Sequence, residues 1–324
     1  MNITKCPSLL LGGFDTYSPR ALKSLFSGKK VSHILPYDAP DVSEESKAKF
    51  LKNRGVISVS GVQAKVGIVQ EGHKLRLTRG GEQSTHILKT SAGELLNGDF
   101  SCANEHLTMR LASQVFGVKT AANGLVFFKN GEAAYITKRF DILPSGDKLK
   151  MEDFASIAQK SPQHGSDFKY DFSYEELGAL IRKVVPAWRV EIEKFFSLVL
   201  FNYIFCNGDA HLKNFSVMQG SAGDYKLAPA YDLMNTRLHL NDRTFAPSKG
   251  LFAGKKLSFV GRADFLEFAK RIECNPQSAK TIIENFTSKE AESASIKLID
   301  ASFLPRKLKQ KYKELFFERL ETLA

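Results

Sequence analysis

Cysteine is scarce in this chain of 324 residues. Its four cysteines, at positions 6, 102, 206 and 274, are far apart, and no two of them form a C-x-x-C pair. This spacing argues against a zinc site, and reduced thiols in a cytoplasm are its simplest interpretation. The sequence also lacks internal repeats and low-complexity segments, as is typical of an ordinary globular protein.

Long apolar runs are lacking as well. The most apolar run, Phe195 to Cys206, is too short to cross a bilayer and contains Asn202, so it predicts a buried helix. At the N-terminus no basic segment precedes a long apolar stretch, and no signal peptide is expected. The composition therefore predicts a protein that does not associate with membranes.

Acidic residues are outnumbered, because 35 Asp and Glu stand against 46 Lys and Arg, which leaves a net charge of +11. This balance favours polyanionic partners such as nucleotides, nucleic acid or an acidic protein surface, without choosing among them. The basic residues are scattered, so the sequence does not indicate a nucleic-acid-binding arm. The length and a hydrophobic fraction of 43% predict two domains or two lobes with a sizeable core.

The segment from Asn207 to Ser216, Asn-Gly-Asp-Ala-His-Leu-Lys-Asn-Phe-Ser, carries the most informative pattern. Asp209 and Asn214 have four residues between them, the spacing at which protein kinases place a catalytic Asp and a metal-binding Asn. Asp232 follows where a second metal-binding carboxylate is needed. Asp209 is therefore the candidate for orienting an acceptor hydroxyl, and Asn214 and Asp232 are candidate Mg²⁺ ligands. The alternative is that Asp209 and Asn214 only cap turns.

Two other residues of this segment have open roles. His211 could act as a base or a metal ligand, although we favour a structural role in which its hydrogen bonds brace the loop. Lys213 could contact a transferred phosphate or could simply be solvated, and the sequence does not choose between these roles.

Earlier residues could complete a nucleotide site. The small residues of Ser58–Lys65 would let backbone N–H groups approach phosphate oxygens, although an ordinary hairpin would look similar. Lys89, at the end of a predicted strand, could hold phosphates and pair with Glu105 on the following helix. A surface Lys and a solvated Glu are the alternatives. The backbone of Lys138–Phe140 could contact adenine as a hinge, or could be the end of an edge strand.

The predicted elements divide the chain into a strand-rich first half and a helix-rich second half. We therefore expect an α+β fold with two lobes, residues 1–145 and 146–324, and a nucleotide in the cleft between them. In the first half we expect a helix at 43–53, strands at 56–61, 65–69, 74–77 and 86–89, a helix at 103–116, and a hairpin of 125–128 with 133–140. In the second half we expect helices at 152–160, 175–185, 191–206, 264–272, 278–285, 290–299 and 306–323, with a short strand pair before Asp232.

These motifs together resemble the HipA family of serine/threonine kinase toxins from bacterial type II toxin–antitoxin systems. They occur in the family's order over roughly residues 56–260. The residues that carry the resemblance are Ser58–Lys65, His86–Lys89, Asn104 and Glu105, Arg139–Asp141, Gly208–Ser216 and Tyr231–Leu233.

The resemblance implies a protein kinase that depends on ATP and Mg²⁺ and has the bilobal HipA-like fold. It assigns catalysis to Asp209, metal binding to Asn214 and Asp232, and autophosphorylation to Ser58 and Ser60. A phosphate on either serine would repel the phosphates of ATP and inactivate the kinase. The implied nucleotide site comprises Ser60, Gly61, Val62, Gln63, Ala64, Lys65, Lys89, Lys138, Arg139, Phe140, Asp209, His211, Tyr231 and Asp232.

The resemblance also implies partners. About fifty-five residues precede the nucleotide loop, whereas longer family members carry a further small subdomain there, so the chain is similar to the short HipT type. This implies a HipS-like small antitoxin and a HipB-like protein through which alone the complex would contact DNA. The implied substrate is an aminoacyl-tRNA synthetase, tryptophanyl-tRNA synthetase for the short type.

Two other functions remain open from the residues. A small-molecule or antibiotic kinase shares the Asp-x-x-x-x-Asn loop, and an inactive nucleotide-binding scaffold in a DNA-bound complex is compatible with the net charge. Autophosphorylation with labelled ATP would favour a protein kinase over the small-molecule kinase. Loss of phosphate transfer in Asp209→Gln would argue against the inactive scaffold.

Overall fold

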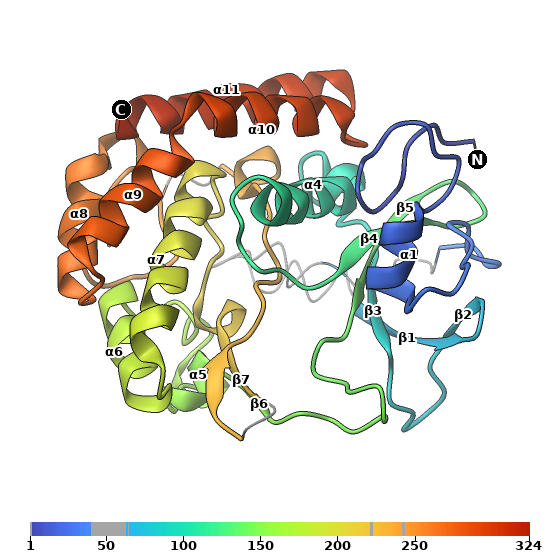
Figure 1. Cartoon of the computed structure of the whole chain (residues 1–324), viewed down its shortest axis with the longest axis horizontal. Coiled ribbons are helices and arrows are strands. Elements are labelled where there is room, and N and C mark those ends of the chain that lie inside the picture. The colour runs from blue at the N-terminus through green and yellow to red at the C-terminus, as the bar shows by residue number, and fades with distance from the viewer. Residues whose placement is uncertain (1, 40–62, 64, 221–222, 242–243) are drawn as a thin grey trace.

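The computed structural model describes residues 2–39, 63, 65–220, 223–241 and 244–324. It shows an α+β architecture in which a sheet-rich part adjoins a helical part, and it confirms the predicted fold class (Figure 1). The predicted helix at 43–53 and the predicted strand at 56–61 lie outside the described residues. Of the candidate nucleotide loop, Gln63 and Lys65 are described, whereas Ser58, Ser60, Gly61, Val62 and Ala64 lie outside the described residues.

The sheet-rich part is built on five antiparallel strands in the order β2-β1-β3-β5-β4. Lys65 and Lys89 are direct partners in the β1–β3 register, so their side chains emerge on the same face at one end of the sheet. This arrangement directs both ammonium groups toward the site described below. The strands are β1 (Lys65–Glu71), β2 (Lys74–Leu77), β3 (His86–Lys89), β4 (Asn123–Phe127) and β5 (Ala133–Lys138).

One helix of this part was not expected from the sequence. Helix α1 (Pro19–Phe26) begins where Ser18 accepts a hydrogen bond from the backbone N–H of Ala21. Proline at the first helical position initiates a helix instead of breaking one, because the amide hydrogen it lacks would have no partner there. Leu25 and Phe26 then bury the inner face of α1 in the smaller of the two main hydrophobic clusters.

Helix α4 (Ser101–Gln114) lies between the large sheet and the C-terminal helices (Figure 1). It packs against β4, β5 and α10, so every residue from Ser101 to Ala112 is buried. The prediction of a helix at 103–116 is confirmed within two residues at each end. Because α4 is covered on all sides, its polar residues are internal, and Glu105 among them faces the site.

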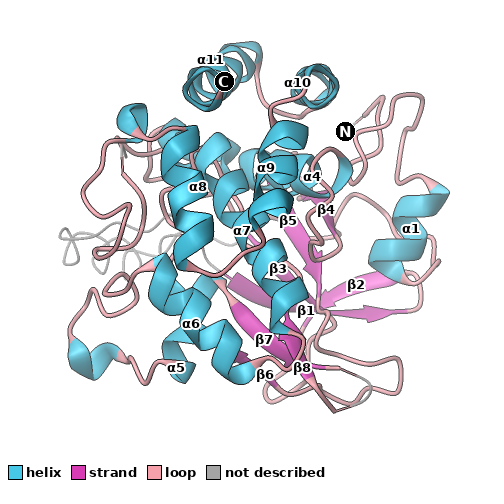
Figure 2. Cartoon of the chain, turned by 60° about the vertical axis from the view of Figure 1, so that its left-hand side comes forward, coloured by secondary structure: helices cyan, strands magenta, loops and turns pink. Residues whose placement is uncertain are grey.

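The helical part follows the predicted order closely. Helices α6 to α9 lie on the side of the molecule opposite the large sheet and α1 in Figure 1, and they come forward in Figure 2. The predicted buried helix is confirmed, since Phe195, Phe196 and Phe201 of α7 are fully buried. The helices are α6 (Tyr174–Val184), α7 (Trp188–Ile204), α8 (Arg262–Arg271), α9 (Pro276–Phe286), α10 (Lys289–Ala301) and α11 (Arg306–Leu323).

The predicted helix at Glu152–Lys160 is largely wrong. Residues Met151–Asp153 form strand β6, and only Phe154–Ile157 are helical, as α5. Strand β6 pairs with β7 (Ser216–Gln219), which pairs in turn with β8 (Tyr225–Leu227), the strand pair expected before Asp232. Strand pairing to a distant segment outweighed the local helical pattern here. Asp153 then caps α5 by accepting from the N–H of Ser156.

A short connection ties the two parts together. A parallel bridge pairs Thr120, just before β4, with Ala230, just before Asp232. The segment that carries Asp232 is therefore fixed to the sheet-rich part as well as to β8. Within the described residues no helix combines the length and apolarity that a membrane crossing requires. The division at residue 145 stays a prediction.

Candidate active site

The segment that carries Asp209 begins where α7 ends. Cys206 adopts a left-handed backbone conformation (φ 52°), which turns the chain out of the helix. The Asn207 side chain then donates to the Asn202 side chain at 3.0 Å, and the turn closes with a 3-10 helix at Leu212–Asn214. A buried polar contact and a one-turn helix thus hold the segment in a fixed shape.

Asp209 lies within this turn with 13% of its side chain exposed. The hydroxyl of Tyr170 donates a 2.6 Å hydrogen bond to its Oδ1 atom. The Nε2 atom of His211 is 4.0 Å from the same oxygen. Asp209 is therefore partly exposed and oriented by a neighbouring phenol.

Asp232 is the point where the two parts of the molecule meet. Its backbone is left-handed (φ 61°), an uncommon conformation for a residue with a Cβ, and such strain concentrates at functional sites. The Asn214 amide nitrogen donates to its Oδ2 atom at 3.3 Å, and the Lys65 ammonium lies 3.5 Å from that oxygen. Lys89 contacts its Oδ1 atom. The structure thus brings together Asn214, Asp232, Lys65 and Lys89, four of the residues named for the site in the sequence analysis.

Lys89 also pairs with Glu105. Their side chains meet at 2.6 Å and are both almost fully buried, so the pairing holds and the alternative of a solvated Glu105 is wrong. Burial alone would lower the pKa of Lys89, but the carboxylates of Asp232 and Glu105 outweigh it and raise that pKa. Burial raises the pKa of Glu105 to about 7, against the opposing effect of the Lys89 ammonium. Lys89 is therefore held as a cation between two carboxylates.

The donors at Asn214 and Asp232 fit a magnesium site. Mg²⁺ needs few protein ligands, because water and phosphate oxygens complete its octahedron. A carboxylate and a carboxamide lie within 3.3 Å of each other here, so two side chains that carry oxygen donors meet at one point. Groups of three or more His, Cys, Asp or Glu side chains suited to a metal are absent from the described part of the chain.

His211 is buried within the same turn. Burial, followed by the charge of Lys169, lowers the pKa of His211 to about 3, so the imidazole is neutral. Its backbone N–H donates to the Asn214 amide oxygen at 3.2 Å, which fixes the shape of the turn. Lys213 pairs with Asp153 at 3.1 Å at the start of α5. Its ammonium is therefore engaged by a carboxylate in this structure.

Phe140 and Tyr231 lie at the other end of the site. Their ring centroids are 6.1 Å apart at an interplanar angle of 31°, and the Tyr231 hydroxyl bonds Ser216 at 2.6 Å and donates to the Lys213 carbonyl at 2.9 Å. Two aromatic faces at a strand end suit a flat base. The side chain of Lys138 instead points to the Ser27 hydroxyl at 2.7 Å, so only its backbone would serve a hinge.

Two predicted contributors have partners of their own. Arg139 makes a two-pronged ion pair with Asp141, at 2.9 and 2.6 Å, so its guanidinium is committed to the chain itself. Gln63 is buried and donates to the Ser101 hydroxyl at 3.1 Å, which anchors the end of the candidate loop to the start of α4.

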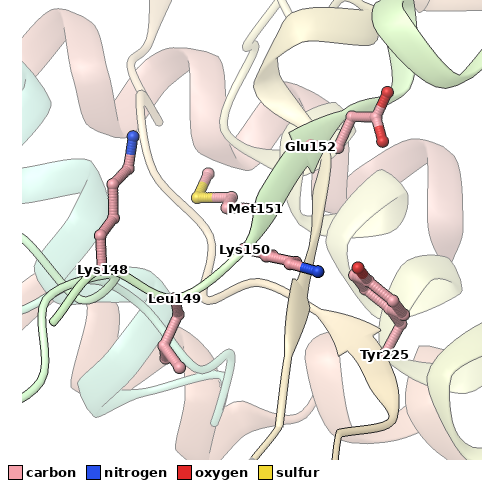
Figure 3. Close-up of a pocket in the computed structure, with 6 residues that line it drawn as sticks. All are labelled: Lys148, Leu149, Lys150, Met151, Glu152 and Tyr225. Carbon is pink, nitrogen blue, oxygen red and sulfur yellow. The ribbon is translucent and has the colours of Figure 1, made fainter.

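A surface depression of about 420 Å³ lies elsewhere. Figure 3 shows its lining: Lys148 and Lys150 come from the segment that leads into β6, and Tyr225 comes from β8. None of the predicted site residues lines it. The convergent side chains, and not this depression, therefore mark the site.

Sequence reasoning did not find Tyr170. It lies 39 positions before Asp209, in the irregular segment that precedes α6, and no motif connects it with the Asp-x-x-x-x-Asn spacing. A pattern of contacts between distant segments was needed to find it.

Comparison with known proteins now bears on the site. The family model described as "HipA-like C-terminal domain" matches residues 57–294, a segment that contains every residue of the candidate site. The chain belongs to this family. The family match confirms the resemblance to HipA, and it leaves the short HipT subtype untested.

Individual relatives are distant. A Haemophilus influenzae protein named "Putative kinase" is 29% identical over 226 residues, which cover 68% of this chain and 63% of that protein. The serine/threonine-protein kinase toxin HipA of Shewanella oneidensis is 28% identical over 205 residues, covering 56% of this chain and 44% of HipA. The chain therefore spans less than two thirds of the length of these relatives.

Solved structures support the fold. HipA of Shewanella oneidensis, solved with HipB and its operator DNA, superposes with a TM-score of 0.65 at 20% identity, covering 89% of this chain and 74% of HipA. The Helicobacter pylori proinflammatory kinase CtkA gives a TM-score of 0.55 at 14% identity, covering 77% of this chain and 90% of CtkA. The bilobal kinase-like fold is thus shared with two structurally known kinases.

Proposed function

We propose that this HipA-like protein is an ATP- and Mg²⁺-dependent kinase that phosphorylates serine side chains of proteins. One observation carries the proposal: Lys89, from the sheet-rich part, and Asn214, from the turn that carries Asp209, both contact Asp232. Phosphoryl transfer needs positioned phosphates, a held metal ion and a group that orients the acceptor. Lys89 would serve the first need, Asn214 with Asp232 the second, and Asp209 the third.

The residues divide the work by their chemistry. Lys89 and Lys65 would neutralise ATP phosphates, and Mg²⁺ held by Asn214 and Asp232 would neutralise charge on the β- and γ-phosphates. Asp209 would accept the hydroxyl proton of the acceptor serine, whose oxygen would attack the γ-phosphorus while the bond to the β-phosphate oxygen breaks and ADP leaves. Glu105 would keep Lys89 extended toward the cleft.

The finer assignments come from the resemblance. We propose that the kinase is a toxin of the short HipT type, inactivated by autophosphorylation at Ser58 or Ser60. A HipS-like small protein and a HipB-like DNA-binding protein would be its partners, and an aminoacyl-tRNA synthetase its substrate. The site of action would be the cytoplasm, where its four buried thiols stay reduced.

Transfer of phosphate from labelled ATP tests the function. The chain should incorporate phosphate on serine, and Asp209→Gln should reduce the rate by at least about 100-fold while leaving the fold intact, because Asp209 is partly exposed. Lys23→Gln, at an exposed position of α1, is the matched control and should behave as the wild type. Wild-type rates in Asp209→Gln would refute catalysis through Asp209.

A further inference from the structure

Tyr170 is placed to act on the catalytic carboxylate although it comes from a separate segment. Its hydroxyl donates to Asp209 Oδ1 at 2.6 Å, the short distance typical of an O–H group bonded to an ionised carboxylate. A carboxylate has two oxygens, so a bond that fixes one of them also fixes the direction of the other. The orientation of Asp209 therefore depends on where Tyr170 is held.

Tyr170 is held by contacts on both sides of its segment. The backbone N–H of Leu212, in the turn that carries Asp209, donates to the Lys169 carbonyl at 3.1 Å. On the far side, the N–H of Ser248 donates to the Tyr170 carbonyl at 2.9 Å. Backbone bonds to the turn and to residues about 80 positions later thus fix this residue without help from a ligand.

The ring of Tyr170 is fixed as well. It stands edge-on to the His211 imidazole, with centroids 5.3 Å apart and an interplanar angle of 73°. The Lys169 ammonium lies 5.0 Å from the ring centroid on its face. Replacing the phenol by a phenyl ring would keep both contacts, so the hydroxyl can be removed without disturbing the packing.

We propose that Tyr170 is a positioning residue of the kinase reaction, whose hydroxyl holds the Asp209 carboxylate in the orientation in which it would receive the acceptor serine. This inference rests on the proposed function. A group prearranged before substrate binds saves the reorganisation that would otherwise add to the barrier. Tyr170 does not touch the transferred phosphate in this scheme and acts only through Asp209.

Tyr170→Phe tests the inference, with Tyr17→Phe as the matched control. Tyr17 also donates a 2.6 Å hydrogen bond, but to the Leu125 carbonyl in the core of the sheet-rich part. The measurement is the rate constant of autophosphorylation against ATP concentration, which separates the maximal rate from the half-saturating concentration of ATP. Tyr170→Phe should lower the maximal rate about 10- to 100-fold, the usual range for a hydrogen bond to a charged group, and leave the half-saturating concentration unchanged.

A pH profile distinguishes positioning from a structural role. The acidic limb of the maximal rate should move to higher pH in Tyr170→Phe, because losing a hydrogen bond to the ionised form raises the pKa of a carboxylate. Tyr17→Phe should keep the wild-type rate and profile. A wild-type rate in Tyr170→Phe, with Asp209→Gln inactive, would overturn the inference and leave the proposed function standing. A wild-type chain that transfers no phosphate would overturn both.

Discussion

Replacing Lys89 by Met should expose how strongly the buried charges of the site depend on one another. The Lys89 side chain is 6% exposed and Glu105 is 1% exposed, so the two ions are removed from water almost completely. Met fills nearly the same volume and carries no charge, and Glu105 would then be left buried without its cation. Breaking a buried pair in this way costs about 3–5 kcal/mol of unfolding free energy.

The loss of unfolding free energy in Lys89→Met should depend on pH, and the direction of this dependence follows from the pKa of Glu105. Burial already raises its pKa to about 7, and loss of the Lys89 ammonium would raise that pKa further. A group whose pKa is higher in the folded state than in the unfolded chain stabilises the fold below its unfolded pKa. That contribution is lost as pH rises through the folded pKa. Lys89→Met should therefore be least destabilised near pH 5, where only the Asp232 contact is lost, and most destabilised near pH 8.

Urea denaturation at several pH values measures this dependence. Lys89→Met combined with Glu105→Gln should recover a large part of the loss at pH 8, since the amide removes the unpaired charge. Lys74→Met, at an exposed position of β2, is the control and should change stability by less than about 0.5 kcal/mol at every pH. A loss in Lys89→Met below about 1 kcal/mol, or one that does not grow with pH, would refute the reasoning.

Two further predictions concern the scaffold. Gly98→Ala should lower the free energy of unfolding by about 3 kcal/mol, because a Cβ there would lie 1.9 Å from the Ala92 carbonyl oxygen. Gly93→Ala, in the same loop, is the control and should be nearly neutral, because its Cβ would meet nothing closer than 3.9 Å. Equal urea midpoints for the two variants would contradict this. His106 is buried, and burial, with the charge of Arg110 second, lowers its pKa to about 3. The neutral imidazole therefore contributes its full stabilisation above the unfolded pKa, and the free energy of unfolding should fall by about 2 kcal/mol between pH 7 and pH 5. His106→Gln should remove this part of the pH dependence. The control His73→Gln, at an exposed position, should leave it in place.

Local patterns predicted the parts of the fold that local forces determine. Strands at 74–77 and 86–89 and the helix at 306–323 have the predicted ends, because alternation and helical periodicity are legible within a few residues. The helix predicted at Glu152–Lys160 was wrong because Met151–Asp153 pair with β7, which lies more than sixty positions later in the chain. Non-local pairing of this kind leaves no trace in the segment itself.

The site shows the same division. The Asp-x-x-x-x-Asn spacing located Asp209 and Asn214, and the strand pattern located Lys89, since each of these depends on neighbours in the chain. Tyr170 was missed because its contact with Asp209 joins two irregular segments. The ion pair between Arg139 and Asp141 was also not predicted, because an Arg two positions before an Asp is common on protein surfaces and does not indicate a contact.

If the protein binds ATP as proposed, charge balance at Asp232 would link nucleotide binding to a rearrangement of the site. In the structure two carboxylates, Asp232 and Glu105, face two ammonium groups, Lys65 and Lys89, so the cluster is close to neutral. The complex of ATP with Mg²⁺ brings a cation that needs Asp232 and an excess of negative phosphate charge that needs the lysines. Under the proposed function both demands would be met by one exchange, in which the lysines would leave Asp232 for the phosphates and the metal would take their place. Glu105 would remain to guide Lys89, which would account for a carboxylate buried beside that ammonium.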